Sequence, residues 1–107
     1  MIPPLIAGPE KSPEPGERQI WVFCLYVAGE APHSQLAVKN LRNICEEYLP
    51  NQYQINLIDV MKNPTLGLQE HIFVTPTLVR IAPQPEVRII GNLSDRLKVL
   101  AALDLED

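Results

Sequence analysis

The run from Ile20 to Val27 constrains the fold of this chain more than any other feature of the sequence. It reads Ile-Trp-Val-Phe-Cys-Leu-Tyr-Val, so both alternating faces of an extended chain would be apolar here. A strand with two apolar faces is stable only when protein covers it on both sides. The run therefore predicts a central strand of a sheet.

A helix and a second strand are predicted after this run. Pro32 or Ser34 opens the helix and Pro50-Asn51 stops it, because proline suits the first helical turn and serine the N-cap. The apolar positions of the segment fall on one helical stripe, formed by Ala37, Leu41, Ile44, Cys45 and Tyr48. Residues 53–60 then alternate as a strand does, and a right-handed crossover would place this strand parallel to the first. The first half is therefore predicted to be a βαβ unit.

The second half gives weaker signals. Asn63 is a good N-cap and Pro64 suits the first helical position, so a short helix is predicted to about Ile72, although Gly67 weakens it and residues 72–74 could equally be strand. Two apolar runs, 78–81 and 87–90, flank the segment 82–86 and predict a hairpin. A last helix is expected to start at Ser94-Asp95.

The segment Thr75-Pro76-Thr77 places a proline where the apolar pattern would otherwise continue as one strand. Proline cannot donate to a sheet, and an X-Pro bond is the one linkage that readily becomes cis, so the strand should begin after Pro76. The resulting order, βαβαββα with a Thr-Pro before the third strand, resembles the thioredoxin fold if Pro76 is a cis-proline. We therefore predict an α/β, thioredoxin-like fold.

Composition excludes several classes of protein. The chain has 107 residues, 46% hydrophobic and 21% charged, which describes one globular domain. A net charge of -4 and the lack of a basic run argue against a nucleic-acid binder. No apolar run is long enough to span a membrane, and the prolines near Met1 make a poor secretory signal. We expect a cytoplasmic protein.

Residues 1–18 contain five prolines and two glycines, a composition that disfavours both helix and strand. We predict a disordered arm here, followed by one domain over residues 19–107. The arm is either an uninvolved tail or a short docking peptide, and the first alternative is the more common behaviour of termini.

No catalytic, metal or cofactor site is predicted. A thioredoxin-like oxidoreductase needs a cysteine at the start of the first helix, and residues 29–35, Gly-Glu-Ala-Pro-His-Ser-Gln, contain none. Cys24 and Cys45 fall in apolar segments and are expected to be core residues. His33 and His71 have no partners at a metal-ligand spacing, and the ordinary role for Ser34 is an N-cap.

Five short segments together resemble the KaiB family of cyanobacterial circadian clock proteins, in order and in spacing. The resemblance covers roughly residues 19 to 104. The segments are Leu25-Tyr26-Val27-Ala28-Gly29, Leu41-Arg42-Asn43-Ile44, Ile58-Asp59-Val60-Met61-Lys62-Asn63-Pro64, Thr75-Pro76-Thr77-Leu78 and Arg88-Ile89-Ile90-Gly91-Asn92-Leu93-Ser94-Asp95-Arg96.

The resemblance implies a non-enzymatic binding protein without cofactor that exists in two folds. Members of the family rest as a homotetramer or dimer in a fold of their own and convert to a monomeric thioredoxin-like form. That form binds the N-terminal ATPase ring of KaiC, captures KaiA and displaces a sensor histidine kinase. The weak signals in the second half fit such a metamorphic region. The alternative is that short segments give weak signals in any single sequence, and the pattern alone favours this alternative.

Residue roles are carried over from the family by position. The expected partner-binding residues are Lys39, Gln54, Asn56 and Asp59. The expected fold and switch residues are Pro76, Gly91, Asn92, Asp95, Ala102 and Asp104.

Four positions depart from the family pattern. Asn56 stands where clock members carry lysine, Gln54 where they carry a small residue, Asn92 replaces an aspartate, and Ala102 stands where glycine is frequent. Alanine favours helix over glycine by about 1 kcal/mol, so we expect a bias toward the conformer in which residues 94–103 are helical. The departures leave open a KaiB-like stress-response or signalling module with a divergent KaiC or another partner.

Overall fold

The computed structural model describes residues 19–105, and the predicted arm and the last two residues lie outside this range. The sheet has the order β2-β1-β3-β4, in which β1 and β2 are parallel and the other neighbours antiparallel. The prediction that residues 20–27 form a central strand is confirmed, as is the βαβ unit. The elements are β1 (Trp21–Val27), α2 (Pro32–Tyr48), β2 (Tyr53–Asp59), α3 (Pro64–Gln69), β3 (Thr77–Ala82), β4 (Val87–Ile90) and α4 (Arg96–Leu103).

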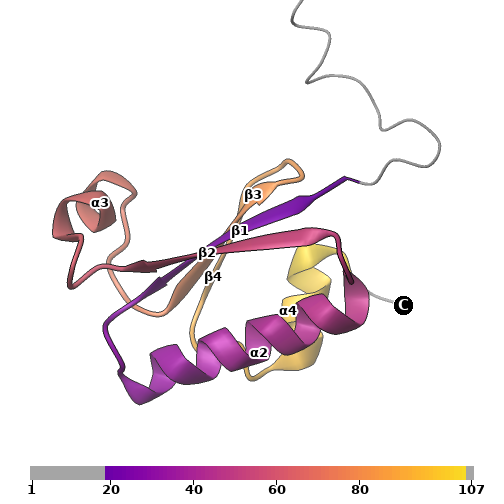
Figure 1. Ribbon diagram of the computed structural model, residues 1–107, viewed down its shortest axis with the longest axis horizontal. Helices are drawn as coiled ribbons and strands as arrows, with labels where there is room; N and C mark the ends of the chain where they lie inside the picture. The colour runs from indigo at the N-terminus through magenta and orange to yellow at the C-terminus, as the bar shows by residue number, and fades with distance from the viewer. Residues whose placement is uncertain (1–18, 106–107) are drawn as a thin grey trace, which may run out of the picture.

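The main core lies between the sheet and two helices. Figure 1 shows α2 and α4 together on one side of the sheet, with α3 beyond the end of β2. Phe23 and Leu25 of β1 are fully buried there, beside Leu41 of α2 and Leu103 of α4. The opposite face of the sheet holds a smaller cluster around Cys24, Tyr26 and Val79. Strand β1 is therefore covered on both faces, as its sequence requires.

The start of α2 differs from the role predicted for Ser34. The helix begins at Pro32 after Ala31, which makes no side-chain capping bond. Ser34 is buried in the first turn, and its Oγ accepts a hydrogen bond from the backbone N–H of Ala28 at 3.1 Å. Of the two predicted starts, Pro32 is confirmed. The N-cap role of Ser34 was wrong, because the N-cap is Ala31, three residues earlier, and Ser34 lies inside the first turn.

The short helix between β2 and β3 also ends earlier than predicted. Helix α3 stops at Gln69, since His71 has a left-handed backbone (φ 59) and the N–H of Ile72 bonds the carbonyl of Gly67 at 2.8 Å. Residues 72–74 are neither helix nor strand. Asn63 precedes the helix without a side-chain capping bond, because its amide donates to the Asp59 carbonyl at 3.3 Å.

The proline boundary and the C-terminal elements agree with the sequence. The Thr75-Pro76 bond is cis and β3 begins at Thr77. Strands β3 and β4 form the hairpin around residues 83–86, and Asp95 caps α4 through a hydrogen bond from the Lys98 N–H. The last helix was predicted to start at Ser94-Asp95, and α4 runs from Arg96 to Leu103.

Candidate partner-binding surface

Two of the expected partner-binding residues lie side by side on an edge strand. Gln54 and Asn56 belong to β2, and the Gln54 Nε2 donates to Asn56 Oδ1 at 3.1 Å. The register pairs Asn56 with Cys24, so both side chains lie on the sheet face away from α2. The surface is therefore polar and uncharged at these two positions, both of which depart from the family pattern.

Asp59 is committed to contacts inside the molecule. Its Oδ1 accepts the backbone N–H groups of Gly29 at 3.0 Å and Met61 at 2.9 Å. These two hydrogen bonds, that from Gly29 first, hold the pKa of the Asp59 carboxyl below its usual value. The carboxylate therefore joins the end of β2 to the loop before α2.

Lys39 is separated from Gln54 and Asn56. It is exposed on α2, which packs against the opposite face of the sheet. The structure therefore divides the expected partner-binding residues between two sides of the sheet.

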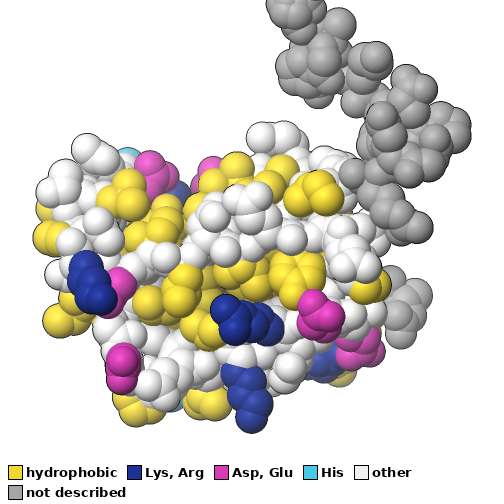
Figure 2. All heavy atoms as spheres, viewed as in Figure 1, with side chains coloured by type: hydrophobic (Ala, Val, Ile, Leu, Met, Phe, Trp, Pro, Cys, Tyr) yellow, Lys and Arg dark blue, Asp and Glu magenta, His cyan; other side chains and the backbone are white. Residues whose placement is uncertain are grey.

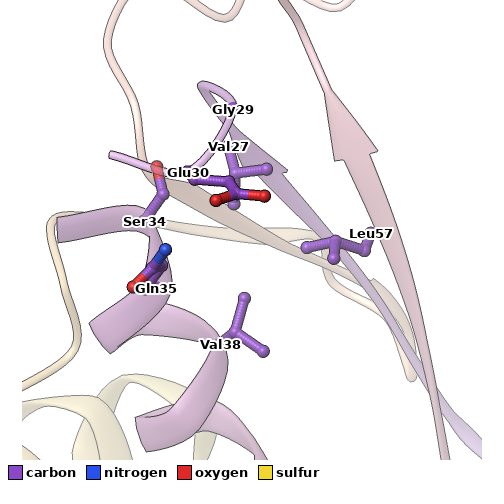
Figure 3. Close-up of a pocket in the computed structure, with 7 residues that line it drawn as sticks. All are labelled: Val27, Gly29, Glu30, Ser34, Gln35, Val38 and Leu57. Atoms are coloured by element: carbon purple, nitrogen blue, oxygen red, sulfur yellow. The ribbon is translucent and has the colours of Figure 1, made fainter. Parts of the chain in front are cut away.

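A hollow of about 380 Å³ lies where the first turns of α2 meet the end of β2. Figure 3 shows Val38 of α2 and Leu57 of β2 converging on it, with Glu30 near Val27. Leu57 is 52% exposed, and Figure 2 shows hydrophobic side chains in a band between β2 and α2. An apolar side chain of a partner fits against Val38 and Leu57, and the Glu30 carboxylate favours a cation of the partner beside it. Sequence analysis missed this hollow because three elements build it.

The expected switch residues fall into two groups. At the start of β3, the Gly91 N–H bonds the Pro76 carbonyl at 2.9 Å, which joins the β4–α4 loop to the cis-proline. Asn92 extends this group: its carbonyl accepts from Asn40 Nδ2 at 2.8 Å and its Nδ2 contacts His33 Nδ1 at 3.1 Å.

The second group lies at the other end of α4. Ala102 is exposed in the last turn of the helix, and Asp104 follows it in a left-handed conformation (φ 60). Asp95 caps the opposite end of the same helix. The roles of all six residues in switching remain predictions.

The thiols occupy positions that suit packing. Cys24 and Cys45 are both free and buried, as predicted. Burial raises the pKa of the Cys45 thiol to about 12, which opposes formation of a nucleophilic thiolate. Within residues 19–105, no group of three His, Cys, Asp or Glu side chains could hold a metal ion. Among the described helices, none is long and apolar enough to cross a bilayer.

Comparisons with known proteins agree on one family and one fold. The KaiB domain matches residues 24–105. The chain is 49% identical over 88 residues to the circadian clock oscillator protein KaiB of Microcystis aeruginosa, covering 82% of this chain and 85% of that protein.

Solved structures match over a similar length. The N-terminal domain of Synechococcus elongatus SasA superposes with a TM-score of 0.67 at 26% identity, covering 92% of this chain and 95% of the domain. Chloroplastic thioredoxin z gives a TM-score of 0.64 at 23% identity, covering 83% and 82% of the two chains, and this likeness concerns the fold alone.

Proposed function

This chain belongs to the KaiB family, and from this premise we propose that it is a non-enzymatic regulator that binds the ATPase ring of a KaiC protein. The observation that carries the proposal is the shared fold of this chain and the SasA N-terminal domain. Two chains with the same fold can compete for one surface of a common partner. The likeness to SasA therefore supports our proposal that this chain competes with a sensor histidine kinase for KaiC.

The thioredoxin-like form supplies two kinds of contact. Strand β2 is one of the two edges of the described sheet, so its outer backbone groups can pair with a strand of a partner such as KaiA. The hollow beside Leu57 and Val38 can accept an apolar side chain next to that edge. Both contacts lie within the βαβ unit of β1, α2 and β2, which places them next to each other on the surface.

Regulation would come from a second packing of the same chain. We propose that the protein rests as a homotetramer or dimer in the cytoplasm and converts to the thioredoxin-like monomer, with residues 1–18 as an arm outside the domain. Such a switch needs two states within a few kcal/mol of each other. The group around Pro76, Gly91 and Asn92, and that around Ala102 and Asp104, would then repack.

Size-exclusion chromatography tests this proposal directly. The protein is run alone, and again after incubation for hours with the KaiC hexamer of the same genome and Mg-ATP. Slow co-elution that grows from an oligomer peak is expected. A well-folded protein that forms no complex with any KaiC of the host would contradict the proposal.

A second candidate is a KaiB-like signalling or stress-response module with a divergent partner. Asn56 favours it, because this residue is uncharged and bonded to Gln54 at the position where clock members carry lysine. Asn56→Lys tests the difference. If a clock-type KaiC or KaiA is the partner, this change should tighten binding by about twofold to fivefold at low salt, the range for an exposed ion pair. Asn43→Lys, an exposed change on α2, adds the same charge elsewhere and is the control.

A further inference from the structure

Arg80 is a cation buried in the main core. It lies on β3, is 3% exposed, and points to the same face of the sheet as the two helices. Burying a guanidinium is costly unless its N–H groups are bonded. Within residues 19–105, no carboxylate pairs with Arg80. The charge must therefore be compensated by other groups.

Three segments far apart in the chain compensate it. Nη1 donates to the Leu103 carbonyl at 2.9 Å, and Nη2 donates to the Pro85 carbonyl at 3.0 Å. The guanidinium carbon lies 5.1 Å from the ring centroid of Trp21, within the range of a cation–π interaction. Nε is buried without a hydrogen-bond partner among the described residues. One side chain thus joins β1, the β3–β4 turn and the end of α4.

The Leu103 carbonyl is the group at which α4 ends. At the end of the helix, the Asp104 N–H donates to the Ala101 carbonyl at 3.2 Å and the Leu105 N–H donates to the Leu100 carbonyl at 2.9 Å. Arg80 bonds the carbonyl of Leu103, the last residue of the helix, and a positive charge is favourable at a helix C-terminus. The side chain therefore caps α4 from the sheet, as well as packing under it.

We propose that Arg80 is the tie that holds the C-terminal segment, residues 96–105, on the sheet, and that this segment opens as a unit when the tie is lost. Leu103 and Pro85 share one guanidinium, so the loss of either hydrogen bond exposes the charge and weakens the other. In the open state water solvates the guanidinium. The remainder of the sheet keeps its own pairing, because β1 is held by β2 and β3.

Hydrogen exchange of the monomer fraction, isolated by size-exclusion chromatography, tests this role of Arg80 residue by residue. Arg80→Met removes the charge and both hydrogen-bond donors but keeps an unbranched side chain. Arg80→Lys keeps the charge without the planar guanidinium that reaches both carbonyls. We expect the amides of Leu103 and Leu105 to exchange about tenfold faster or more in both variants, while the amide of Leu25 in β1 changes less. Arg88→Met, on the neighbouring strand and exposed, should leave all three rates unchanged.

Two results would overturn the inference. One is unchanged exchange at Leu103 and Leu105, within about twofold. The other is an equal acceleration at Leu25, because Arg80 would then contribute only to global stability. If Arg80→Met does not fold, the comparison of Arg80→Lys with the wild type decides. No partner protein is used, so the result is independent of ring binding.

Discussion

The carboxylate of Asp59 accepts the backbone N–H of Gly29 at 3.0 Å, across 30 positions of the sequence. Gly29 has a left-handed backbone (φ 56), and the same carboxylate oxygen also accepts the N–H of Met61. The end of β2 therefore fixes the loop from which α2 starts. The hollow lined by Glu30 and Ser34 depends on this connection.

Asp59→Asn should make the stability of the protein less sensitive to acid. The folded pKa of Asp59 lies below its usual value, so the carboxylate stabilises the fold above about pH 4, and this contribution is lost as the pH falls through the lowered pKa. Asparagine keeps an acceptor but does not titrate. The variant should be less stable than the wild type at pH 7, and the difference should shrink below about pH 4.

Urea unfolding at a series of pH values measures this effect. Asp104→Asn is the matched control, because that exposed side chain makes no hydrogen bond in the described structure. A difference between wild type and Asp59→Asn that does not change with pH would show that the carboxylate charge contributes nothing.

Cys45 should resist alkylation in the native protein. Burial raises its pKa to about 12, so at pH 8 the thiolate is scarce and also inaccessible. Thiol labelling with a chromogenic disulfide should detect Cys45 only after unfolding in urea. Cys45→Ala should accordingly remove one thiol from the count in urea and leave native labelling as it was. Native labelling of Cys45 as fast as in urea would contradict the buried position.

Leu103→Ala should destabilise the protein by about 2–5 kcal/mol, because it removes a large side chain from a closed core. Leu103 is 0% exposed, whereas Leu97 in the same helix is 79% exposed. Leu97→Ala should change the free energy of unfolding by no more than about 0.5 kcal/mol. Urea unfolding of the two variants gives the comparison, and equal losses would mean that α4 does not pack through Leu103.

Ala102→Gly should weaken α4 by about 1 kcal/mol, which is the difference in helix propensity at an exposed site. Far-ultraviolet circular dichroism should show a loss of helix, and the midpoint of urea unfolding should fall. Ala31→Gly is the control, because residue 31 is the N-cap of α2, where glycine is tolerated better than alanine. No helix loss in Ala102→Gly would count against the expected bias of this chain toward a helical C-terminal segment.

Local sequence signals predicted an element correctly where a residue type or pattern allows few backbone conformations. Pro76 set the start of β3, Asp95 set the start of α4, and the uniformly apolar run to Val27 identified the central strand. The signals were weakest at residues 72–74, where a left-handed His71 ends α3 early. A positive φ at histidine leaves no clear mark in a sequence.

The amino-acid sequence alone determined the fold class, the family resemblance and the absence of a cysteine where a thioredoxin-like enzyme would need one. Tertiary structure decided the rest: the inward turn of Ser34, the hollow beside Leu57, and the burial of Arg80 under α4. The reason is distance along the chain. Periodicity and capping act within a few residues, whereas the contact of Arg80 with Leu103 spans 23 positions and exists only after the helix has packed on the sheet.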